Sequence, residues 1–336
     1  MLELRSIGNT DIKACPVALG TWAMGGGAFW NRSDVPEPEK EAIGTIHAAI
    51  DNGITLIDTA PAYGFGESEE IIGKALKGIR HKAVIATKCG LWWHDDTGAF
   101  YFEKDGITLR RSLDPKTIRQ EVDFSLKRLG TDYIDLYQTH WQADPAVPTP
   151  IADTMACLLD LKKQGKIRAI GVSNVTIGQL EEYIAAGGIQ SNQPRFSMLD
   201  RSLETGILPF CREQGISILA YSPLEQGLLT GAITMDKTFG KTEYRSRIPW
   251  FLPANRRKVI DMLAGWKTLT DKYACTLSQL VIAWTIAQPG ITFALCGGRK
   301  VKHIKENAKA ALLTLEQEDI KRIRADVEKL GEPAKG

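Results

Sequence analysis

The sequence is poor in the residues that most often bind metals, and it arranges none of them in a metal-binding pattern. Its 336 residues include 5 histidines and 6 cysteines, with no cysteine pair at C-x-x-C spacing and no H-E-x-x-H segment. We therefore expect no metal site. A histidine and two aspartates stand together at 94–96, and we interpret them as the polar tip of a loop. The cysteines lie far apart in apolar contexts, as expected of reduced core residues in the cytoplasm.

Long apolar runs and an excess of one charge are also lacking. No window approaches 18 uninterrupted apolar residues, and the first residues do not resemble a signal peptide, so we expect neither export nor a membrane partner. The 42 basic and 40 acidic residues are spread along the chain and give a net charge of +2. This balance does not resemble a nucleic-acid-binding protein. The oligomeric state, monomer or small homo-oligomer, is left open by the sequence.

What the sequence does contain is an alternation of short apolar runs with amphipathic segments, after an N-terminal stretch with hairpin character. The apolar runs, each predicted to be a strand, are 17–21, 56–59, 83–88, 134–140, 167–173, 190–193, 216–221 and 291–296. The amphipathic segments, each predicted to be a helix, are 39–51, 68–76, 115–129, 151–164, 177–185, 204–214, 277–287 and 301–310.

The character of these strands distinguishes between two α/β architectures. Near-continuous apolar strands without an obvious edge strand favour a (β/α)8 TIM barrel over a doubly wound sheet. No linker divides the chain, so we expect one domain over 1–336. The glycines at 25–27 lack G-x-G-x-x-G spacing, which argues against a Rossmann site. Long loops follow the third strand, at 90–113, and the seventh, at 223–255, and we expect them to cover an active site.

Four polar residues fall at or just beyond the carboxyl ends of neighbouring predicted strands, namely Asp58, Tyr63, Lys88 and His140. On a barrel these positions meet at one mouth. An ammonium beside a phenol lowers a phenol pKa that starts near ~10, while a carboxylate holds the ammonium in place. Such a phenol can protonate a carbonyl oxygen, and His140 can hydrogen-bond the same oxygen. Each residue alone has an ordinary structural explanation, but four at such positions favour a proton-transfer site.

These residues belong to longer motifs, D-T-A-P-A-Y-G at 58–64, G-V-S-N at 171–174 and G-G-R-K-V-K-H-I-K-E-N at 297–307. Together they resemble the aldo-keto reductase superfamily, most of all its bacterial sugar, inositol and general-stress members. The resemblance implies an enzyme that reversibly reduces a small aldehyde or ketone with NADPH, or less well with NADH. It implies Tyr63 as general acid and base, Lys88 and Asp58 as its tuning pair, and His140 as the residue that orients the carbonyl.

The same resemblance assigns cofactor contacts. It implies that Ser173, Asn174 and Gln193 hold the nicotinamide carboxamide and that Tyr221 stacks on the ring. Further contacts are expected from Thr21, Trp22, Ser222, Leu224, Gly227, Leu229, Gly298, Arg299, His303, Glu306 and Asn307. His303 stands where many relatives have Gln or Arg. Independently, two glycines followed by Arg299 and Lys300 near a predicted helix start suit a phosphate, although a solvated helix start is the alternative.

Tryptophans cluster in the loops expected around the mouth, at positions 22, 30, 92, 93, 141 and 250, among polar residues. Aromatic rings stack on the C–H face of a sugar while polar neighbours bind its hydroxyls. We therefore expect a sugar or related carbonyl as substrate, in contact with Trp22, Trp30, Trp92, Trp93, His140 and Trp141. The alternative interpretation is that these tryptophans only pack the long loops.

Two other functions remain open at this stage. One is a broad-specificity reductase that detoxifies aldehydes. The other is an NADPH-binding, redox-sensing regulatory subunit, against which the intact tetrad argues. A metal-dependent sugar isomerase on the same barrel would need ligands that the sequence does not supply.

Overall fold

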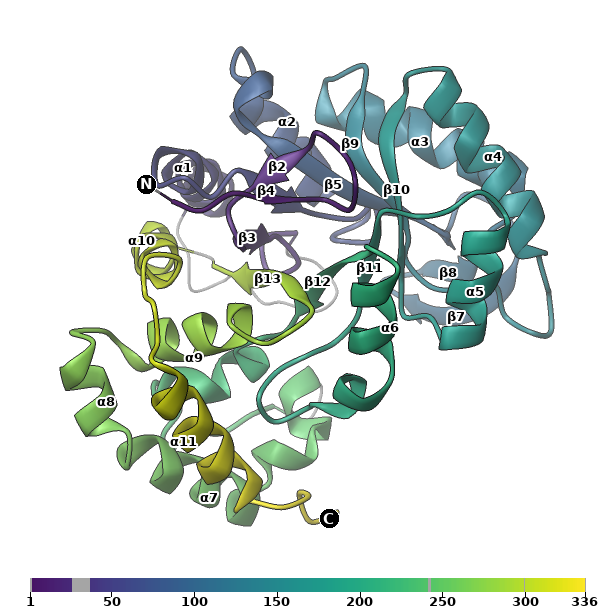
Figure 1. The fold of residues 1–336 in the computed structure, drawn as a ribbon. Coiled ribbons are helices and arrows are strands. Elements are labelled where there is room, and N and C mark those ends of the chain that lie inside the picture. The colour runs from purple at the N-terminus through teal and green to yellow at the C-terminus, as the bar shows by residue number, and fades with distance from the viewer. Residues whose placement is uncertain (1, 26–36, 241–242, 299, 336) are drawn as a thin grey trace.

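Eight parallel strands close into a barrel at the centre of the molecule (Figure 1). The structure is a computed structural model, and it describes residues 2–25, 37–240, 243–298 and 300–335. The barrel strands are β3 (Val17–Gly20), β4 (Leu56–Asp58), β5 (Val84–Cys89), β9 (Ile134–Thr139), β10 (Ile167–Ser173), β11 (Ser191–Gln193), β12 (Ser217–Tyr221) and β13 (Ile291–Gly297). The predicted (β/α)8 barrel and all eight predicted strands are confirmed.

Helices lie around the barrel and cover its outer face (Figure 1). The helices that alternate with the strands are α1 (Pro38–Asp51), α2 (Glu67–Leu76), α3 (Pro115–Leu129), α4 (Ile151–Lys163), α5 (Ile177–Ala185), α6 (Ile207–Glu213), α9 (Leu277–Ile286) and α10 (Val301–Ala310). Three more are α7 (Pro253–Ala264), α8 (Lys267–Lys272) and α11 (Gln317–Glu328). Across the described parts of the chain, no helix is long and apolar enough to cross a bilayer.

The helix predicted for 204–214 is in fact interrupted. A 3-10 turn, η2 (Ser202–Thr205), precedes α6, and Gly206 lies between them with φ −143° and ψ −80°. This backbone conformation lies outside the helical region, so the two segments do not form one helix. The amphipathic pattern of the sequence does not reveal this break.

Apolar side chains from seven of the eight barrel strands fill the barrel interior, and a hairpin closes the end opposite the strand carboxyl ends. The inward cluster includes Ala18, Leu56, Ala86, Leu136, Ala169, Leu219 and Phe293. Ile7 and Ile12 join this cluster from the hairpin of β1 (Arg5–Ser6) and β2 (Lys13–Ala14). Because side chains alternate along a strand, the residues two positions further on also point inward. This periodicity places Asp58, Lys88, Gln138 and Tyr221 at the upper end of the same interior.

The long connection after β5 is a small sheet rather than an irregular loop. Strands β6 (Leu91–Trp92), β7 (Ala99–Lys104) and β8 (Ile107–Arg111) pair antiparallel in the order β6-β8-β7. The β7–β8 turn has Asp105 at φ 53° and Gly106 at φ 77°. Positive φ at both central residues is typical of a tight hairpin turn. This turn brings β7 and β8 together as paired strands, where the sequence analysis expected an irregular loop.

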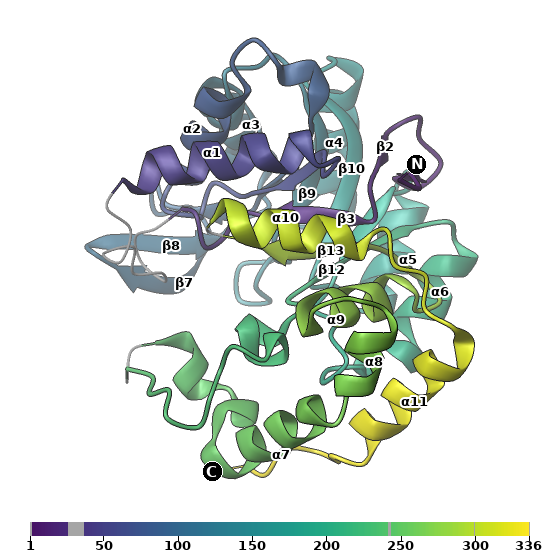
Figure 2. The ribbon, with the colours of Figure 1, turned by 90° about the vertical axis from the view of Figure 1, so that its left-hand side faces the viewer.

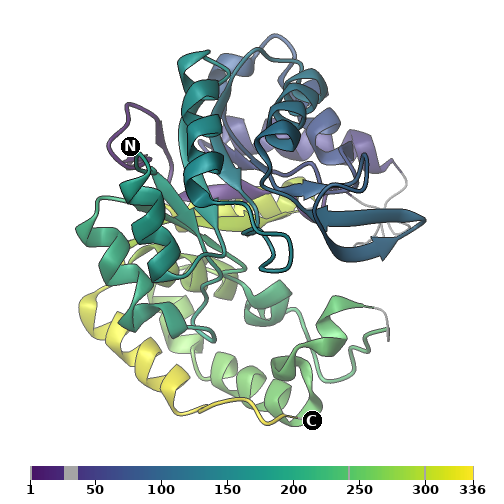
Figure 3. The ribbon, with the colours of Figure 1, turned by 90° about the vertical axis from the view of Figure 1, so that its right-hand side faces the viewer.

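The second long connection, after β12, consists of short 3-10 turns. These are η3 (Glu225–Thr230), η4 (Tyr244–Arg247) and η5 (Pro249–Phe251), and they lead into α7. Figures 2 and 3 view the molecule from opposite sides, and both show this connection and the β7–β8 hairpin projecting from the same end of the barrel. That end is the one at which the barrel strands terminate, as expected for an active-site cover.

Candidate active site

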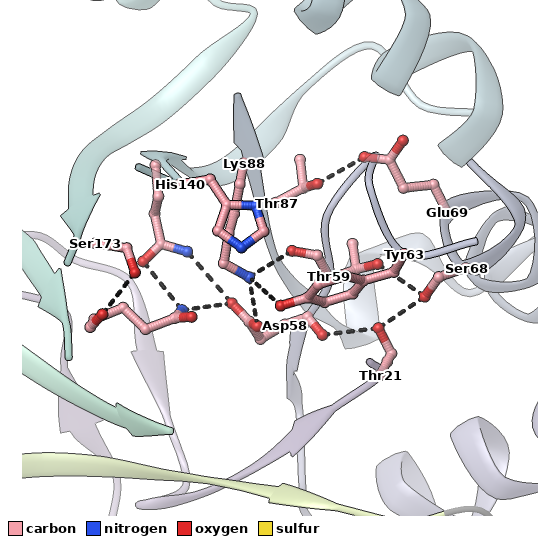
Figure 4. A network of polar contacts seen from close by, with 12 residues as sticks. Thr21, Asp58, Thr59, Tyr63, Ser68, Glu69, Thr87, Lys88, His140 and Ser173 are labelled. Carbon is pink, nitrogen blue, oxygen red and sulfur yellow. Dashed lines mark hydrogen bonds and ion pairs between the residues drawn. The ribbon is translucent and has the colours of Figure 1, made fainter. Parts of the chain in front are cut away.

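Three of the four predicted catalytic side chains meet at one ammonium group (Figure 4). Nζ of Lys88 donates to Oδ1 of Asp58 at 2.7 Å, to the carbonyl of Thr59 at 2.8 Å and to the hydroxyl of Tyr63 at 3.2 Å. The ring of His140 stands edge-on to that of Tyr63, with 5.8 Å between centroids. Lys88 and Asp58 are buried, whereas Tyr63 and His140 are partly exposed. A substrate can therefore reach the phenol and the imidazole but not the ion pair beneath them.

The ionisation of this group differs in one respect from the sequence-based expectation. Burial raises the pKa of Tyr63 above its ordinary value of 10.0, and the Lys88 ammonium offsets only part of the rise. The expected lowering is therefore wrong for the protein without substrate, because desolvation of the phenolate outweighs the nearby cation. The phenol stays protonated at neutral pH, which is the form that donates a proton.

The charges of Lys88 and His140 are fixed in opposite ways. Burial alone would lower the pKa of Lys88, but Asp58 and Tyr63 act against it and the net pKa is raised. Burial and repulsion from the same ammonium hold the pKa of His140 well below its ordinary value of 6.5. His140 is thus a neutral imidazole, which suits a hydrogen-bonding residue rather than a proton donor.

Two polar side chains that the sequence analysis did not assign to catalysis complete the shell of Asp58. Gln193 donates from Nε2 to Oδ2 of Asp58 at 2.7 Å, and Gln138 donates to the same oxygen at 3.3 Å. Gln138 was missed, although it lies on β9 two residues after the inward-facing Leu136 and therefore shares its inward face. Gln193 was predicted only as a nicotinamide contact.

Close packing of two glycines positions the turn that carries Tyr63. A β-carbon on Gly25 would lie 2.6 Å from the backbone of Tyr63, and one on Gly64 would lie 1.9 Å from the carbonyl oxygen of Gly25. No larger residue fits at either position without moving this turn. The G-T-W-A-M-G segment after β3 is therefore needed to place the phenol.

Hydroxyl groups and one buried carboxylate form hydrogen bonds to the strands that carry Asp58 and Lys88 (Figure 4). Ser68 donates to Thr21, which in turn donates to the carbonyl of Asp58 at 2.9 Å. The carboxylate of Glu69 on α2 accepts from Thr87 at 2.6 Å and pairs with Arg128 of α3 at 2.7 Å. Thr21 was predicted as a cofactor contact, and in this structure its hydroxyl is engaged with the backbone of β4.

The residues predicted to hold the nicotinamide carboxamide form one hydrogen-bonded group beside His140. Asn174 donates to the carbonyl of His140 at 3.0 Å and to Ser173, and it accepts from the hydroxyl of Tyr221 at 3.0 Å. Asn174 has φ 57°, a conformation that asparagine tolerates better than most residues. The group presents amide and hydroxyl atoms near the catalytic phenol, as an amide ligand requires.

The segment predicted to cover the pyrophosphate has an unusual backbone. Positive φ angles occur at Ser222 (60°), Glu225 (46°), Gln226 (48°) and Gly227 (93°). An ion pair with a fully buried carboxylate holds it, because Glu225 accepts two hydrogen bonds from Nη2 of half-buried Arg195, at 2.8 and 2.7 Å. The side chains of Leu224 and Leu229 are half-buried and fully buried respectively, so Leu229 is confined to backbone contacts with any ligand.

The predicted adenosine end lies at the start of α10. Gly298 is buried against Ile304, and Arg299 lies outside the described residues. His303 is exposed, whereas Glu306 accepts from Thr276 at 2.6 Å and Asn307 contacts the carbonyl of Gly297 at 3.4 Å. Glu306 and Asn307 therefore already have partners within the protein.

The tryptophans predicted for substrate binding have different environments. Trp92 is 1% exposed, donates to Asp95 at 2.7 Å and stacks on Phe124 of α3. Its assignment to the substrate is therefore wrong, since it anchors the inserted sheet to the barrel. Trp93 and Trp141 are half-buried, and Trp93 packs against Phe65, two residues after Tyr63.

Three tryptophans of the predicted cluster remain, and the two of them that the structure describes also differ in exposure. Trp22 is half-buried and meets Tyr244 of η4 edge-on at 5.9 Å, which joins the loops after β3 and β12. Trp250 is buried, and Trp30 lies outside the described residues. Within those residues, no group of three metal-ligating side chains comes together.

A barrel whose mouth carries a hydrogen-bonded Tyr–Lys–Asp group and a neutral histidine is typical of a carbonyl-reducing enzyme. Residues 16–328 match the model of the Aldo/keto reductase family. The chain belongs to the aldo/keto reductase family, and it is an NAD(P)H-dependent oxidoreductase. The family inferred from the sequence motifs is thereby confirmed.

Relatives of known sequence or structure match over nearly their whole length. The chain is 44% identical to the NADH-specific methylglyoxal reductase of Escherichia coli, over 96% of this chain and 98% of that protein. It is 40% identical to the aldo-keto reductase YhdN of Bacillus subtilis, over 97% and 94%. The glycerol dehydrogenase of Gluconobacter oxydans has a similar structure, with a TM-score of 0.86 and 35% identity over 99% and 97% of the two chains.

Proposed function

We propose that this enzyme reduces the carbonyl of a small polar aldehyde or ketone to the alcohol, with Tyr63 as the proton donor. The observation that carries the proposal is the contact between Nζ of Lys88 and the hydroxyl of Tyr63 at the carboxyl ends of the barrel strands. The raised pKa of Tyr63 keeps its proton available at neutral pH. Neutral His140 donates a hydrogen bond to the carbonyl oxygen and fixes its position near the phenol.

A nicotinamide cofactor fits the groups beside this site. When bound, it supplies the hydride that reduction requires. Ser173, Asn174 and Gln193 would hold its carboxamide, Tyr221 would stack on its ring, and the backbone with positive φ at Ser222 and from Glu225 to Gly227 would cover its phosphates. Backbone N–H groups in such a conformation form concave sites for anions.

NADPH is proposed as the preferred cofactor, because Arg299 and Lys300 directly precede α10 in the sequence. A cation and a helix N-terminus together suit an additional phosphate. The Escherichia coli relative, however, is named as NADH-specific. Replacement Arg299→Ala decides the matter for this chain. If the residue binds the 2′-phosphate, NADPH affinity falls about tenfold or more while NADH affinity is unchanged, and equal losses would contradict the proposal.

Two substrate classes follow from separate observations. Half-buried Trp22, Trp93 and Trp141 beside polar loops support a sugar or another polyhydroxylated carbonyl. The name of the Escherichia coli relative supports a small 2-oxoaldehyde, as a broad detoxifying reductase would accept. We further propose that the enzyme acts in the cytoplasm, and that residues 1–336 act as one domain.

Steady-state assays test the reaction and separate the two classes. The panel contains methylglyoxal, glyceraldehyde, aldoses and aldoses from which hydroxyls are removed one at a time, each with NADPH and NADH. If the site forms hydrogen bonds with the hydroxyls of the substrate, kcat/KM falls steeply along that series, because polar groups of the site are left unpaired. If simple aldehydes match every sugar, the detoxifying function is favoured. If no carbonyl in the panel is reduced with either cofactor, the proposed function fails.

A further inference from the structure

Among the described residues, one arginine without an acidic partner packs on the tryptophan that directly follows the catalytic histidine. Arg111 ends β8, and its guanidinium carbon lies 4.5 Å from the ring centroid of Tyr101 and 5.0 Å from that of Trp141. Trp141 directly follows His140 in the chain. Within the residues that the structure describes, the side chain of Arg111 forms no hydrogen bond or ion pair, and its buried Nε has no partner.

The position of Arg111 relative to the catalytic residues is fixed by two backbone hydrogen bonds. His140 donates from its backbone N–H to the carbonyl of Cys89 at 2.8 Å, and Ser112 donates to the carbonyl of Gly90 at 3.3 Å. Cys89 and Gly90 directly follow Lys88. The residues next to Lys88 are therefore joined both to His140 and to the residue after Arg111, so the end of β8 is tied to the backbone around the catalytic residues, and the Arg111 guanidinium lies over the ring of the residue that follows His140.

The pairing of β8 shows which way this side chain points. Arg111 pairs with Leu91 and Ala99, both buried, and it shares a face of the strand with buried Leu109. Arg110 points to the opposite face, where it pairs with exposed Asp96. Alternation along the strand thus places Arg111 on the face of the buried Leu91, Ala99 and Leu109, and Arg110 on the opposite face, where its charge is paired with Asp96.

The surroundings of Arg111 differ from those of the other half-buried arginines near the site. Arg128 pairs with Glu69 and Arg195 pairs with Glu225, so both charges are neutralised within the protein. The rings of Tyr101 and Trp141 lie against the Arg111 guanidinium, and within the described residues no N–H group of this side chain has a hydrogen-bond partner. A planar guanidinium edge matches the two oxygens of a carboxylate.

We propose that Arg111 binds a carboxylate on the substrate, so that the enzyme prefers carbonyl compounds that carry an acidic group apart from the reacting carbon. The inference rests on the proposed carbonyl reduction at Tyr63 and His140, and it specifies the substrate class of that site. The carboxylate neutralises a charge that is already in place, whereas a neutral analogue of equal size leaves the guanidinium unpaired.

Matched aldehydes test this preference. The probes are 3- and 4-formylbenzoate and the corresponding formylbenzamides, which have nearly the same shape and differ in charge. The expected result is a kcat/KM at least about tenfold higher for one formylbenzoate than for its amide. In Arg111→Met this ratio falls to near one, because kcat/KM decreases for the formylbenzoate and not for the amide. In Arg111→Lys the ratio is partly retained. The control Arg110→Met leaves the ratio unchanged.

Three outcomes overturn the proposal. One is a ratio near one in the wild-type enzyme for both pairs. Another is an equal loss for acid and amide in Arg111→Met, which shows that Arg111 only packs the inserted sheet. The third comes from calorimetry, which does not depend on turnover. The proposal is overturned if benzoate binds the wild-type protein no more tightly than benzamide, or if Arg111→Met leaves the difference between them unchanged. If benzoate binds in this way but no aldehyde is reduced, the proposed function fails while the anion site stands.

Discussion

The side-chain amide of Gln193 donates a 2.7 Å hydrogen bond to Oδ2 of Asp58 inside the barrel. The other oxygen of the same carboxylate accepts from Lys88, which in turn contacts the hydroxyl of Tyr63. A residue predicted to touch the cofactor is therefore also linked to the proton donor, through the side chains of Asp58 and Lys88. Gln138 donates to Asp58 as well, but it belongs to β9 and was not predicted to touch the cofactor.

Replacement of these two glutamines separates the two roles. Gln193→Leu should raise the dissociation constant of NADPH and also lower kcat about tenfold, since a hydrogen bond to a charged group contributes about 1.5–3 kcal/mol. Gln138→Leu should lower kcat with little change in cofactor affinity. Fluorescence titration and single-turnover kinetics measure the two quantities. Equal effects of both replacements on cofactor affinity would show that Gln193 has no contact of its own with the cofactor.

The ion pair of Glu225 with Arg195 is expected to control cofactor affinity. It holds a segment whose backbone has positive φ at Glu225 and Gln226, and such a conformation persists only when its surroundings enforce it. Glu225→Gln should weaken NADPH binding about tenfold, the equivalent of about 1.4 kcal/mol, while kcat at saturating cofactor is kept.

Another bidentate pair in the chain provides the control for that replacement. Glu204 of η2 accepts two hydrogen bonds from Arg324 of α11, both at 2.8 Å, outside the predicted cofactor segment. Glu204→Gln should lower thermal stability without changing cofactor affinity. The role assigned to Glu225 would be refuted by a Glu225→Gln protein that is folded and binds NADPH as tightly as the wild type.

The catalytic residues could be located from the sequence because their chemistry coincides with the geometry of a barrel. Asp58, Lys88 and His140 end apolar runs, and the ends of parallel strands in a barrel must converge. The hairpin of β7 and β8 was also predictable in principle. Asp105-Gly106 between two strand-like runs is a strong hairpin signal, which the interpretation of 90–113 as a loop did not use.

Other features depend on contacts that no local pattern reveals. The partner of Arg195 is Glu225, 30 residues away, and both charges look like surface residues in the sequence. Trp92 was assigned to the substrate because of its residue type, yet packing on Phe124 decides its role. The pKa of Tyr63 depends on how deeply the phenol is buried, and composition and spacing do not report that depth.

A buried carboxyl group should make stability depend on pH. Glu121 of α3 accepts from the backbone N–H of Gly90 at 2.8 Å, while its second oxygen has no partner. Burial raises its pKa to about 8 from an ordinary value of 4.5. Between these values the folded protein keeps a proton that the unfolded chain has lost. This contribution to stability is therefore full below about pH 4.5 and is lost as the pH rises to about 8, by at most about 1.4 kcal/mol per pH unit.

Glu121→Gln removes this titration and keeps an acceptor for Gly90. The melting temperature of the variant relative to wild type should therefore rise from pH 5 to pH 8 and level off above about pH 9. Glu181→Gln, at an exposed position of α5, should show no such trend. A constant difference between Glu121→Gln and wild type across this range would contradict the raised pKa of Glu121.

The central claim is that Tyr63 donates the proton, and Tyr63→Phe tests it most directly. Phenylalanine keeps the ring that packs beside His140 and removes only the hydroxyl that contacts Lys88. Loss of a positioned general acid typically lowers a rate by about 10²–10⁴-fold. The measurement is kcat for the best aldehyde substrate, together with the dissociation constant of NADPH by fluorescence. The account predicts a fall in kcat of this size with cofactor affinity unchanged, and near-wild-type kcat in the folded variant would contradict it.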